Sequence, residues 1–359
     1  MRLKVLHISP EHLTGTLSAF KKGHTEMGTY CRFCTLFKSK SRYDEDISLN
    51  LSFIPKSKWL IKARDFIYKT KNTDRELPGY PPLWRPSTPI ENLFFKLRDE
   101  VWSTKIEAAI EKYDLLNFDI YHLESGLGFY RDGRVIRKLK SLGKKIVCFY
   151  HGQDLRIRGV IPQIDELSDV NLTSELDLLR KHPKIEYLFL PFDTSKFKPK
   201  AYLNKKLKIC HATTNRYFKG SDRIIQVCEE LEREYNIEFV LIENRPHSES
   251  LQMKSRCDVY IDQISNTGGW GYGMNSVEAL SMGLACLTNL VPTYEKFIPD
   301  HPFINITPSN MKEKLAELIH NKEVILKKGL EGRRWVEHHH EVKVVLKKLY
   351  QIYRRDGWI

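Results

Sequence analysis

The sequence predicts an α/β protein of two Rossmann-like, doubly wound parallel-sheet domains that face a cleft. Two observations lead to this fold class. Short runs rich in leucine and β-branched residues alternate with helical patterns, and parallel strands require such crossovers. The alternation also stops at a polar, proline-bounded stretch, residues 191–206, and then begins again. With 359 residues, the chain is long enough for two separate hydrophobic cores.

The first domain is placed at residues 1–195. Its expected elements, in chain order, are a strand at 3–8, a helix at 17–37, and strands at 118–123, 145–150 and 187–190 with helical segments between the last three. The expected first helix contains Cys31 and Cys34 in a C-x-x-C. No second ligand pair follows at zinc-site spacing, and therefore we interpret both cysteines as helix-packing residues.

The second domain is placed at residues 196–341. Strands are expected at 207–211, 239–242, 259–261 and 285–288, and helices over the stripe that begins at Ile224 and at 250–256 and 276–282. A last helix begins near residue 342, and we expect residues 342–359 to pack back on the first domain.

One segment, residues 53–89, breaks the alternation because it is basic, aromatic and rich in proline. On a helix, Trp59, Phe66 and Ile67 would share a face, with lysines and arginines from 56 to 71 around it. This pattern suits a membrane interface, but the simpler interpretation, which we prefer, is a helix packed on its own domain. The next helix is expected to begin with Thr88 as N-cap and Glu91 completing a capping box.

The net charge of +13 is unevenly distributed, since residues 1–150 hold 27 Lys and Arg against 17 Asp and Glu. Such a surplus favours a polyanion or an anionic membrane as a partner. No recognisable nucleic-acid module accompanies it, which leaves a nucleic-acid-associated protein as the weaker alternative. Seven cysteines at irregular spacings, no apolar run near the roughly 20 residues of a membrane span, and no secretion signal predict a cytoplasmic protein.

A basic turn follows the expected strand at 207–211, in HATTNRYFKGSDRII. Arg216 and Lys219 stand at a helix entrance, where free amides and the helix dipole already favour an anion. The two cations predict a phosphate or diphosphate site. The competing interpretation is a pair of solvated charges on a turn.

A glycine-rich loop in the same domain, GGWGYGMNSVEALSMG, supports the phosphate interpretation. Its glycines allow close approach of the backbone to a ligand, and the amides near Met274, Asn275 and Ser276 precede a helix. One turn further on, Glu278 can accept two hydrogen bonds from a vicinal diol such as a ribose.

These segments in series resemble the GT-B glycosyltransferases of the retaining, glycogen-synthase-like clan, the group 1 or family 4-like enzymes. The resemblance is carried by PFDTSKF, HATTNRYFKGSDRII, LIENRPHSESLQMKSRCDVYIDQ and GYGMNSVEALSMGLACLT. In the first domain, FYHGQDLRIRG resembles the His-Gly-x-Asp-x-Arg element of a bacterial branch, and FDIYHLESG with GKKIVCFYHG follows its strand order. The resemblance covers nearly the whole chain except about residues 40–105.

The resemblance implies a role for each matching residue. Lys219 and Arg216 would hold the donor diphosphate, and Glu278 matches the second acid of the family's Glu-x7-Glu element. The first acid, which binds the donor sugar hydroxyls in the family, is replaced by Trp270. The other positions that the resemblance assigns to donor binding are Gly15, His247, Gly271, Tyr272, Gly273, Met274, Asn275 and Ser276, and His151 would lean on the donor sugar.

The implied activity is transfer of a sugar, with retention, from a nucleotide-diphosphate donor to a glycan or lipid-linked acceptor in surface polysaccharide or glycolipid synthesis. No metal or other cofactor is expected, because the cations can stabilise the leaving diphosphate and no Asp-x-Asp element precedes a suitable loop. His151 is assigned to positioning and electrostatics, and its competing interpretation is a histidine bonded within its own domain. A catalytically silent nucleotide-sugar-binding protein of the same fold is the main alternative, made plausible by Trp270.

Overall fold

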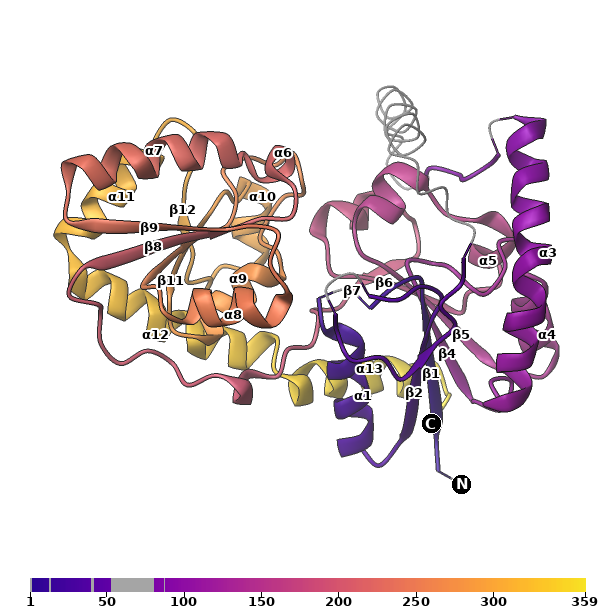
Figure 1. Ribbon diagram of the computed structural model, residues 1–359. Helices are drawn as coiled ribbons and strands as arrows, with labels where there is room; N and C mark the ends of the chain where they lie inside the picture. Colours follow the sequence, from indigo (N-terminus) through magenta and orange to yellow (C-terminus); the bar gives the residue numbers. More distant parts are fainter. Residues whose placement is uncertain (1, 13, 40–41, 53–80, 87) are drawn as a thin grey trace. The chain divides into compact units, whose positions relative to one another are not determined.

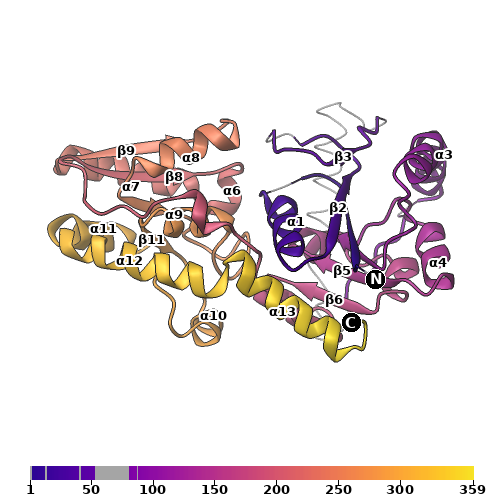
Figure 2. The same cartoon turned by 90° about the horizontal axis from the view of Figure 1, so that it is seen from below.

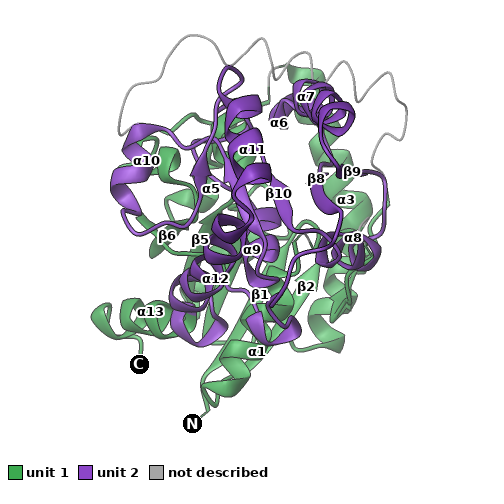
Figure 3. Cartoon of the chain, turned by 90° about the vertical axis from the view of Figure 1, so that its left-hand side faces the viewer, with its two compact units in different colours: residues 1–190, 346–359 green, residues 191–345 purple. Residues whose placement is uncertain are grey.

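The computed structural model describes residues 2–12, 14–39, 42–52, 81–86 and 88–359. The expected basic helix at 56–71 therefore lies outside the described residues. The chain divides into two compact units, which Figure 3 distinguishes by colour. Unit 1 comprises Met1–Leu190 and Leu346–Ile359, and unit 2 comprises Pro191–Val345.

Unit 1 contains a parallel sheet with the strand order β3-β2-β1-β4-β5-β6-β7 among the described residues. Its strands are β1 (Lys4–Ser9), β2 (Tyr30–Thr35), β3 (Ile47–Ser48), β4 (Ile120–Glu124), β5 (Lys145–Tyr150), β6 (Val170–Thr173) and β7 (Ile185–Tyr187). Its α-helices are α1 (Thr16–Glu26), α3 (Pro89–Lys112), α4 (Arg134–Ser141) and α5 (Pro162–Asp165), together with most of α13 (Val342–Arg355), which begins in unit 2.

The two faces of this sheet differ in chemistry. Alternate residues of a strand point to opposite faces, and Leu6 and Tyr121 belong to the apolar core that includes Trp102 of α3 and Leu139 of α4. The intervening residues, His7 among them, point to the face that α1 and α13 cover, and Figure 2 shows these two helices opposite α3 and α4. One face of the sheet is therefore hydrophobic, and the other carries buried polar groups.

Unit 2 contains a second parallel sheet, with the strand order β12-β11-β10-β8-β9 among the described residues. Its strands are β8 (Leu207–Ala212), β9 (Ile237–Ile242), β10 (Val259–Ile261), β11 (Ala285–Thr288) and β12 (Ile304–Asn305). Its helices are α6 (Arg216–Lys219), α7 (Ser221–Glu234), α8 (His247–Ser255), α9 (Met274–Ser281), α10 (Pro292–Phe297), α11 (Met311–His320) and α12 (Lys322–His339). Figure 1 shows α7 and α11 on one face and α8, α9 and α12 on the other.

The expected fold class, two doubly wound parallel α/β sheets, is confirmed. In each sheet the chain reverses its direction of winding once, between β1 and β4 in unit 1 and between β8 and β10 in unit 2. Loops that leave the carboxyl ends of strands at such a switch point are the usual ligand-binding elements of this architecture. The basic turn follows β8 directly, which places it at the switch point of unit 2.

Two expected elements are wrong. The helix predicted over 17–37 ends as α1 at Glu26, and Gly28, with φ +80°, leads the chain into β2, which pairs with β1. Cys31 and Cys34 therefore lie in a strand rather than a helix, where pairing with β1 overrides local propensity. The strand expected at 187–190 is β7, which ends at Tyr187, and the short strand β6 was not predicted.

The predicted helix starts are better placed. Thr88 caps α3 as expected, since its side chain accepts a hydrogen bond from the Glu91 amide at 3.1 Å. The apolar stripe of α7, which includes Ile224, Val227 and Leu231, is fully buried in the core of unit 2.

None of the described helices has the combination of length and hydropathy needed to cross a bilayer.

Candidate active site

The basic turn is held in one conformation by local sequence. Asn215 caps α6 by accepting a hydrogen bond from the Tyr217 amide at 3.0 Å, and Gly220 follows α6 with φ +68°. A Cβ at Gly220 would lie 2.6 Å from Cγ1 of Ile264, so that no larger residue fits without rearrangement. The result is that α6, a single turn, places Lys219 beside the end of β10.

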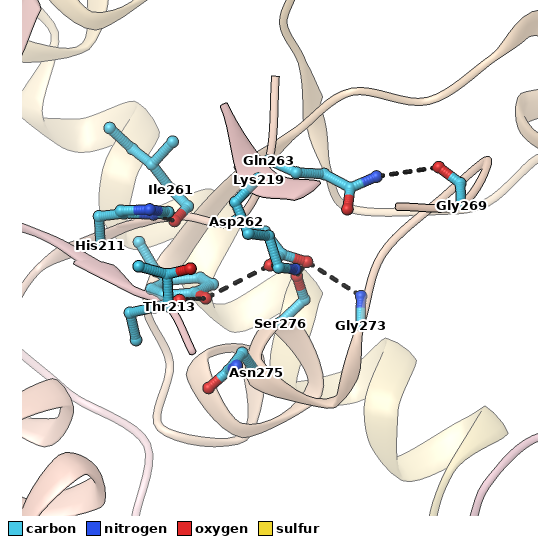
Figure 4. A network of polar contacts seen from close by, with 12 residues as sticks. His211, Thr213, Lys219, Ile261, Asp262, Gln263, Gly269, Gly273, Asn275 and Ser276 are labelled. Atoms are coloured by element: carbon cyan, nitrogen blue, oxygen red, sulfur yellow. Dashed lines mark hydrogen bonds and ion pairs between the residues drawn. The ribbon is translucent and has the colours of Figure 1, made fainter. Parts of the chain in front are cut away.

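Lys219 forms an ion pair with Asp262, the residue directly after β10. Asp262 is fully buried, and its other oxygen accepts hydrogen bonds from the Gly273 amide at 2.9 Å and the Ser276 hydroxyl at 2.7 Å. Figure 4 shows Asp262 among these groups. Burial raises the pKa of Asp262. The charge of Lys219 and the hydrogen bonds from Lys219, Gly273 and Ser276 outweigh this effect and bring the pKa below its ordinary value. One ionised carboxylate thus joins the basic turn to the start of α9.

A glutamine shapes the glycine-rich loop from inside. The side-chain amide of Gln263 donates to the carbonyl oxygens of Gly269 at 3.1 Å and Gly271 at 2.7 Å, the first of which is drawn in Figure 4. A Cβ at Gly271 would lie 2.6 Å from Cε2 of Tyr294, and hence this glycine is required by close packing. The loop therefore reaches the N-terminus of α9 along a fixed path.

The two predicted cations have different surroundings. Arg216 donates to both oxygens of Glu243, at 2.9 and 2.6 Å, and to Asp222 at 3.2 Å, while its side chain remains 48% exposed. The Lys219 side chain is 19% exposed and has a buried partner. Lys219 is consequently the more firmly positioned of the two. Arg216 lies on the more exposed side of the turn, where it is paired with Glu243.

Glu278 is the most enclosed of the predicted site residues that carry a charge. One of its oxygens pairs with Nε2 of His247 at 2.7 Å, and the other accepts from Nζ of Lys254 at 2.6 Å. Lys254 is fully buried, also donates to the Asn275 side chain at 2.8 Å, and lies 5.1 Å from the centre of the Tyr260 ring. Burial raises the pKa of Glu278, but Lys254 and His247 outweigh it and hold the pKa below its ordinary value.

These contacts leave Glu278 able to accept further hydrogen bonds. An ionised carboxylate offers about four acceptor positions, and the contacts with His247 and Lys254 use one on each oxygen. The chemistry of this group is therefore suited to two neighbouring hydroxyls.

His211 lies at the end of β8, behind the basic turn. Its Nδ1 donates to the Ile261 carbonyl at 2.8 Å, which leaves Nε2 to accept from the Ser221 hydroxyl at 2.7 Å. Burial lowers the pKa of His211 to about 4 despite the bond to Ile261. A neutral imidazole therefore links two strands to the first residue of α7.

The other residues predicted in or beside the glycine-rich loop have side chains engaged elsewhere or placed at the start of α9. Tyr272 turns into the unit 2 core, where its hydroxyl bonds Nε2 of His340 at 2.8 Å and its ring stacks on Phe303. Met274 is the first residue of α9. Trp270 is half-buried, and its carbonyl accepts from the Val291 amide at 3.3 Å.

Two predicted site residues belong to unit 1. His151 follows β5, stacks on Phe149 with 4.6 Å between ring centres, and bonds Glu124 through Nε2 at 2.6 Å. Burial lowers the pKa of His151, but the bond and charge of Glu124 raise it above its ordinary value. Gly15 caps α1 with φ +72°, and a Cβ there would lie 3.2 Å from the Tyr43 ring.

Sequence reasoning missed three residues of these networks. Asp262 and Glu124 each stand at the carboxyl end of a strand of a parallel sheet, and that position was a signal that could have identified them. Lys254 gave no such signal, because a lysine in a short, mostly polar helix normally extends into solvent.

No protein-family model matches the sequence, and no curated protein matches it either. Solved structures do match over essentially the whole chain. The pneumococcal O-GlcNAc transferase GtfA, in complex with UDP and GlcNAc, shares 11% identity with a TM-score of 0.59, covering 99% of each chain. Anabaena HepE in complex with UDP-glucose shares 9% identity with a TM-score of 0.57, covering 99% of this chain and 100% of its own.

An enzyme of another class has a similar architecture. The UDP-GlcNAc 2-epimerase of Neisseria meningitidis, bound to UDP-GlcNAc, shares 12% identity with a TM-score of 0.56, covering 98% of this chain and 100% of its own. Identities this low establish the architecture alone. With two doubly wound parallel sheets and full-length similarity to these structures, the chain has the GT-B fold of glycosyltransferases.

Proposed function

We propose that this protein is a retaining glycosyltransferase that uses a nucleoside-diphosphate sugar in the synthesis of a surface polysaccharide or glycolipid. One observation carries the proposal. Asp262 joins Lys219 to the Gly273 amide and to Ser276, so that a cation and the N-terminus of α9 converge at the switch point of unit 2. A cation beside free helix amides is a combination suited to a diphosphate.

Donor cleavage by this site follows from charge. Breaking the anomeric bond places negative charge on the departing diphosphate, which a preorganised cation and amides stabilise. Lys219 has three N–H donors, and Asp262 engages it through one hydrogen bond, so that others can reach a phosphate oxygen. Arg216 adds positive charge on the outer side of the turn. With these groups in place, the proposed chemistry requires no divalent metal.

The nucleoside is assigned to Glu278. Its carboxylate is ionised, positioned by Lys254 and His247, and able to accept from the two hydroxyls of a ribose. The backbone from Gly271 to Ser276 would then lie along the diphosphate and sugar. In the glycosyltransferases that the sequence resembles, an acid at the position of Trp270 binds the hydroxyls of the donor sugar. Because this acid is replaced by Trp270, the proposal names no particular sugar.

Unit 1 is assigned two roles. For the donor sugar, His151, which is ion-paired with Glu124, is the group proposed to position it and support it electrostatically.

Acceptor binding is also assigned to unit 1. The helix α3 also presents an apolar stripe to solvent, in which Ile90, Leu93, Leu97 and Val101 are 55–81% exposed. Together with the positive surplus of residues 1–150, the stripe favours an anionic membrane surface and hence a lipid-linked acceptor at the cytoplasmic face.

Isothermal titration with UDP, GDP, ADP and their common sugar conjugates tests the proposal. We expect one nucleoside diphosphate to bind, Glu278→Gln to bind it about tenfold more weakly, and Glu278→Ala to lose more, because each removes hydrogen bonds to the ribose. Glu317→Gln, a change at an exposed acid of α11, is the matched control. Equal affinity in all four proteins would contradict the assignment of Glu278.

An epimerase that acts on the sugar nucleotide is a second candidate, favoured by the similarity to the Neisseria enzyme. A catalytically silent nucleotide-sugar-binding protein is the third. Incubation of the bound sugar nucleotide without acceptor separates them, followed by NMR of the products. A transferase releases free sugar slowly, an epimerase forms a new sugar nucleotide, and a silent protein leaves the compound unchanged.

A further inference from the structure

Unit 1 contains a buried cluster of histidines that the proposed transferase chemistry does not use. His7 of β1, His24 of α1 and His122 of β4 are each 0% exposed and lie on the sheet face covered by α1 and α13. The ring of His7 stacks on that of His122 at 4.4 Å between centres and lies 5.6 Å from that of His24. Three polar rings thus occupy a place where most proteins pack aliphatic side chains.

Each of two histidines is fixed through one ring nitrogen. Nδ1 of His7 bonds Glu124 at 2.8 Å, and Nδ1 of His24 bonds the Tyr350 hydroxyl of α13 at 3.0 Å. The opposite nitrogen of each ring, Nε2, is buried and has no hydrogen-bond partner among the described residues. An unpaired buried polar atom costs on the order of 1–3 kcal/mol. Two such atoms, in rings whose centres lie 5.6 Å apart, call for a ligand.

A thiol completes the group. Cys31 of β2 is 3% exposed, and one ligand atom from each of His7, His24 and Cys31 lies within 4.8 Å of the others. We propose that His7, His24 and Cys31 bind a Zn²⁺ ion. Two imidazoles and a thiolate match the preference of zinc for nitrogen and sulfur, and they supply three of its four tetrahedral positions. The hard, oxygen-preferring cations Mg²⁺ and Ca²⁺ do not suit this donor set.

The groups behind the ligands match those of zinc sites. A ligating histidine usually donates its second ring N–H to a carboxylate, as His7 does to Glu124, and this contact fixes the tautomer that leaves Nε2 for the metal. Tyr350 fixes His24 in the same way, since its hydroxyl can accept from Nδ1.

Negative charge is available at this position. A Zn²⁺ ion buried without counter-charges would be very unfavourable. The Cys31 thiolate supplies one negative charge directly, and binding releases the thiol proton to solvent. The Glu124 carboxylate, which also pairs with His151, offsets part of the second charge through His7. The ion would cross-link β1, α1 and β2, and through His7 it would hold Glu124 in place for His151. The site therefore lies beneath the proposed transferase residues of unit 1 without being part of the donor chemistry.

The test measures zinc in the purified full-length chain by plasma mass spectrometry, in a His338→Asn background that removes an exposed histidine. We expect one equivalent per chain. After removal of the metal under a strong chelator, ZnCl₂ should raise the melting temperature by roughly 5–10 °C at a hundredfold excess over its dissociation constant. CoCl₂ should give the near-ultraviolet charge-transfer band of a cobalt–thiolate bond.

Paired variants identify the ligands. Cys31→Ser and His24→Gln should each lower zinc affinity at least a hundredfold. Cys31→Ser should also abolish the cobalt–thiolate band, and His24→Gln should weaken it. Cys34→Ser is the matched control, because Cys34 is a fully buried cysteine of the same strand outside the cluster. Stoichiometric zinc in Cys31→Ser, or no zinc binding and no cobalt–thiolate band in the parent chain, would overturn the proposal. If Cys31→Ser fails to fold, the cobalt spectrum of the parent chain decides alone.

Discussion

Lys254 donates a hydrogen bond to Glu278 at 2.6 Å in the interior of unit 2, with the lysine 0% and the glutamate 3% exposed. Both members are nearly removed from water, which means that neither charge can be compensated by solvent if the other is lost. The pair thus fixes an ionised carboxylate in the second turn of α9, in the place where we assign the ribose.

Replacement of Lys254 by methionine should be strongly destabilising. It leaves the Glu278 carboxylate buried without its main counter-charge, a loss of about 3–5 kcal/mol in the free energy of unfolding. Nucleotide affinity should fall as well, because the carboxylate becomes protonated or moves. Urea denaturation and titration calorimetry check the two effects. Lys208→Met removes a lysine from a partly exposed pair with Glu238 and should change the free energy of unfolding by less than about 1 kcal/mol.

Loss of Lys219 should impair turnover more than loss of Arg216. We expect kcat/KM to fall on the order of 100-fold in Lys219→Ala and about tenfold in Arg216→Ala, with part of each loss in kcat, because the contacts strengthen as the diphosphate departs. Steady-state kinetics with the identified donor measures this. The reverse order, or unchanged kcat in Lys219→Ala, would remove the diphosphate assignment.

The buried His211 should make stability depend on pH. Burial lowers its pKa to about 4 from an ordinary value of 6.5, and hence the unfolded chain binds a proton more readily than the folded chain. Its contribution is fully present above pH 6.5 and is lost as the pH falls through 4, by about 3 kcal/mol in all. His211→Gln should flatten the decline in unfolding free energy between pH 6.5 and 4. His338→Gln, at an exposed position in α12, should leave the decline unchanged.

Chelation should not abolish transfer. Because Lys219 and the amides of α9 are proposed to stabilise the leaving diphosphate, millimolar EDTA should leave most of the initial rate, and added Mg²⁺ or Mn²⁺ should not raise it. An ion bound by His7, His24 and Cys31 would be buried and would not enter this measurement on the time scale of an assay. Complete loss with EDTA that Mg²⁺ or Mn²⁺ restores would show that the phosphate site needs a divalent metal.

The apolar stripe of α3 should contribute to membrane attachment. Leu93→Glu combined with Leu97→Glu should lower sedimentation with anionic vesicles roughly tenfold, because two exposed apolar contacts are replaced by charges that the lipid surface repels. Binding of the parent chain should also weaken as salt rises. Leu330→Glu, at an exposed leucine of α12, is the control. Vesicle binding unaffected by both the substitutions and the salt would favour a soluble acceptor.

The sequence by itself determined the two α/β series, most strand positions in unit 2 and the two loops of the candidate donor site. These features are local, since a strand is a short apolar run, a helix is a 3.6-residue period, and glycines and cations at a helix start have a direct chemical meaning. The helix predicted over 17–37 was wrong because the prediction rested on local patterns alone. Residues 30–35 form β2 because β1 pairs with them, and no local pattern records that pairing.

Only the tertiary structure decided which polar groups meet. Asp262 joins the basic turn to the glycine-rich loop because β8 and β10 are neighbours at the switch point, although they are separated in sequence by β9 and α8. His7, His24 and Cys31 come from three elements and converge because β1 lies beside β2 and α1 crosses both. Such meetings depend on strand order and register, in which a shift of one residue would turn every side chain to the other face.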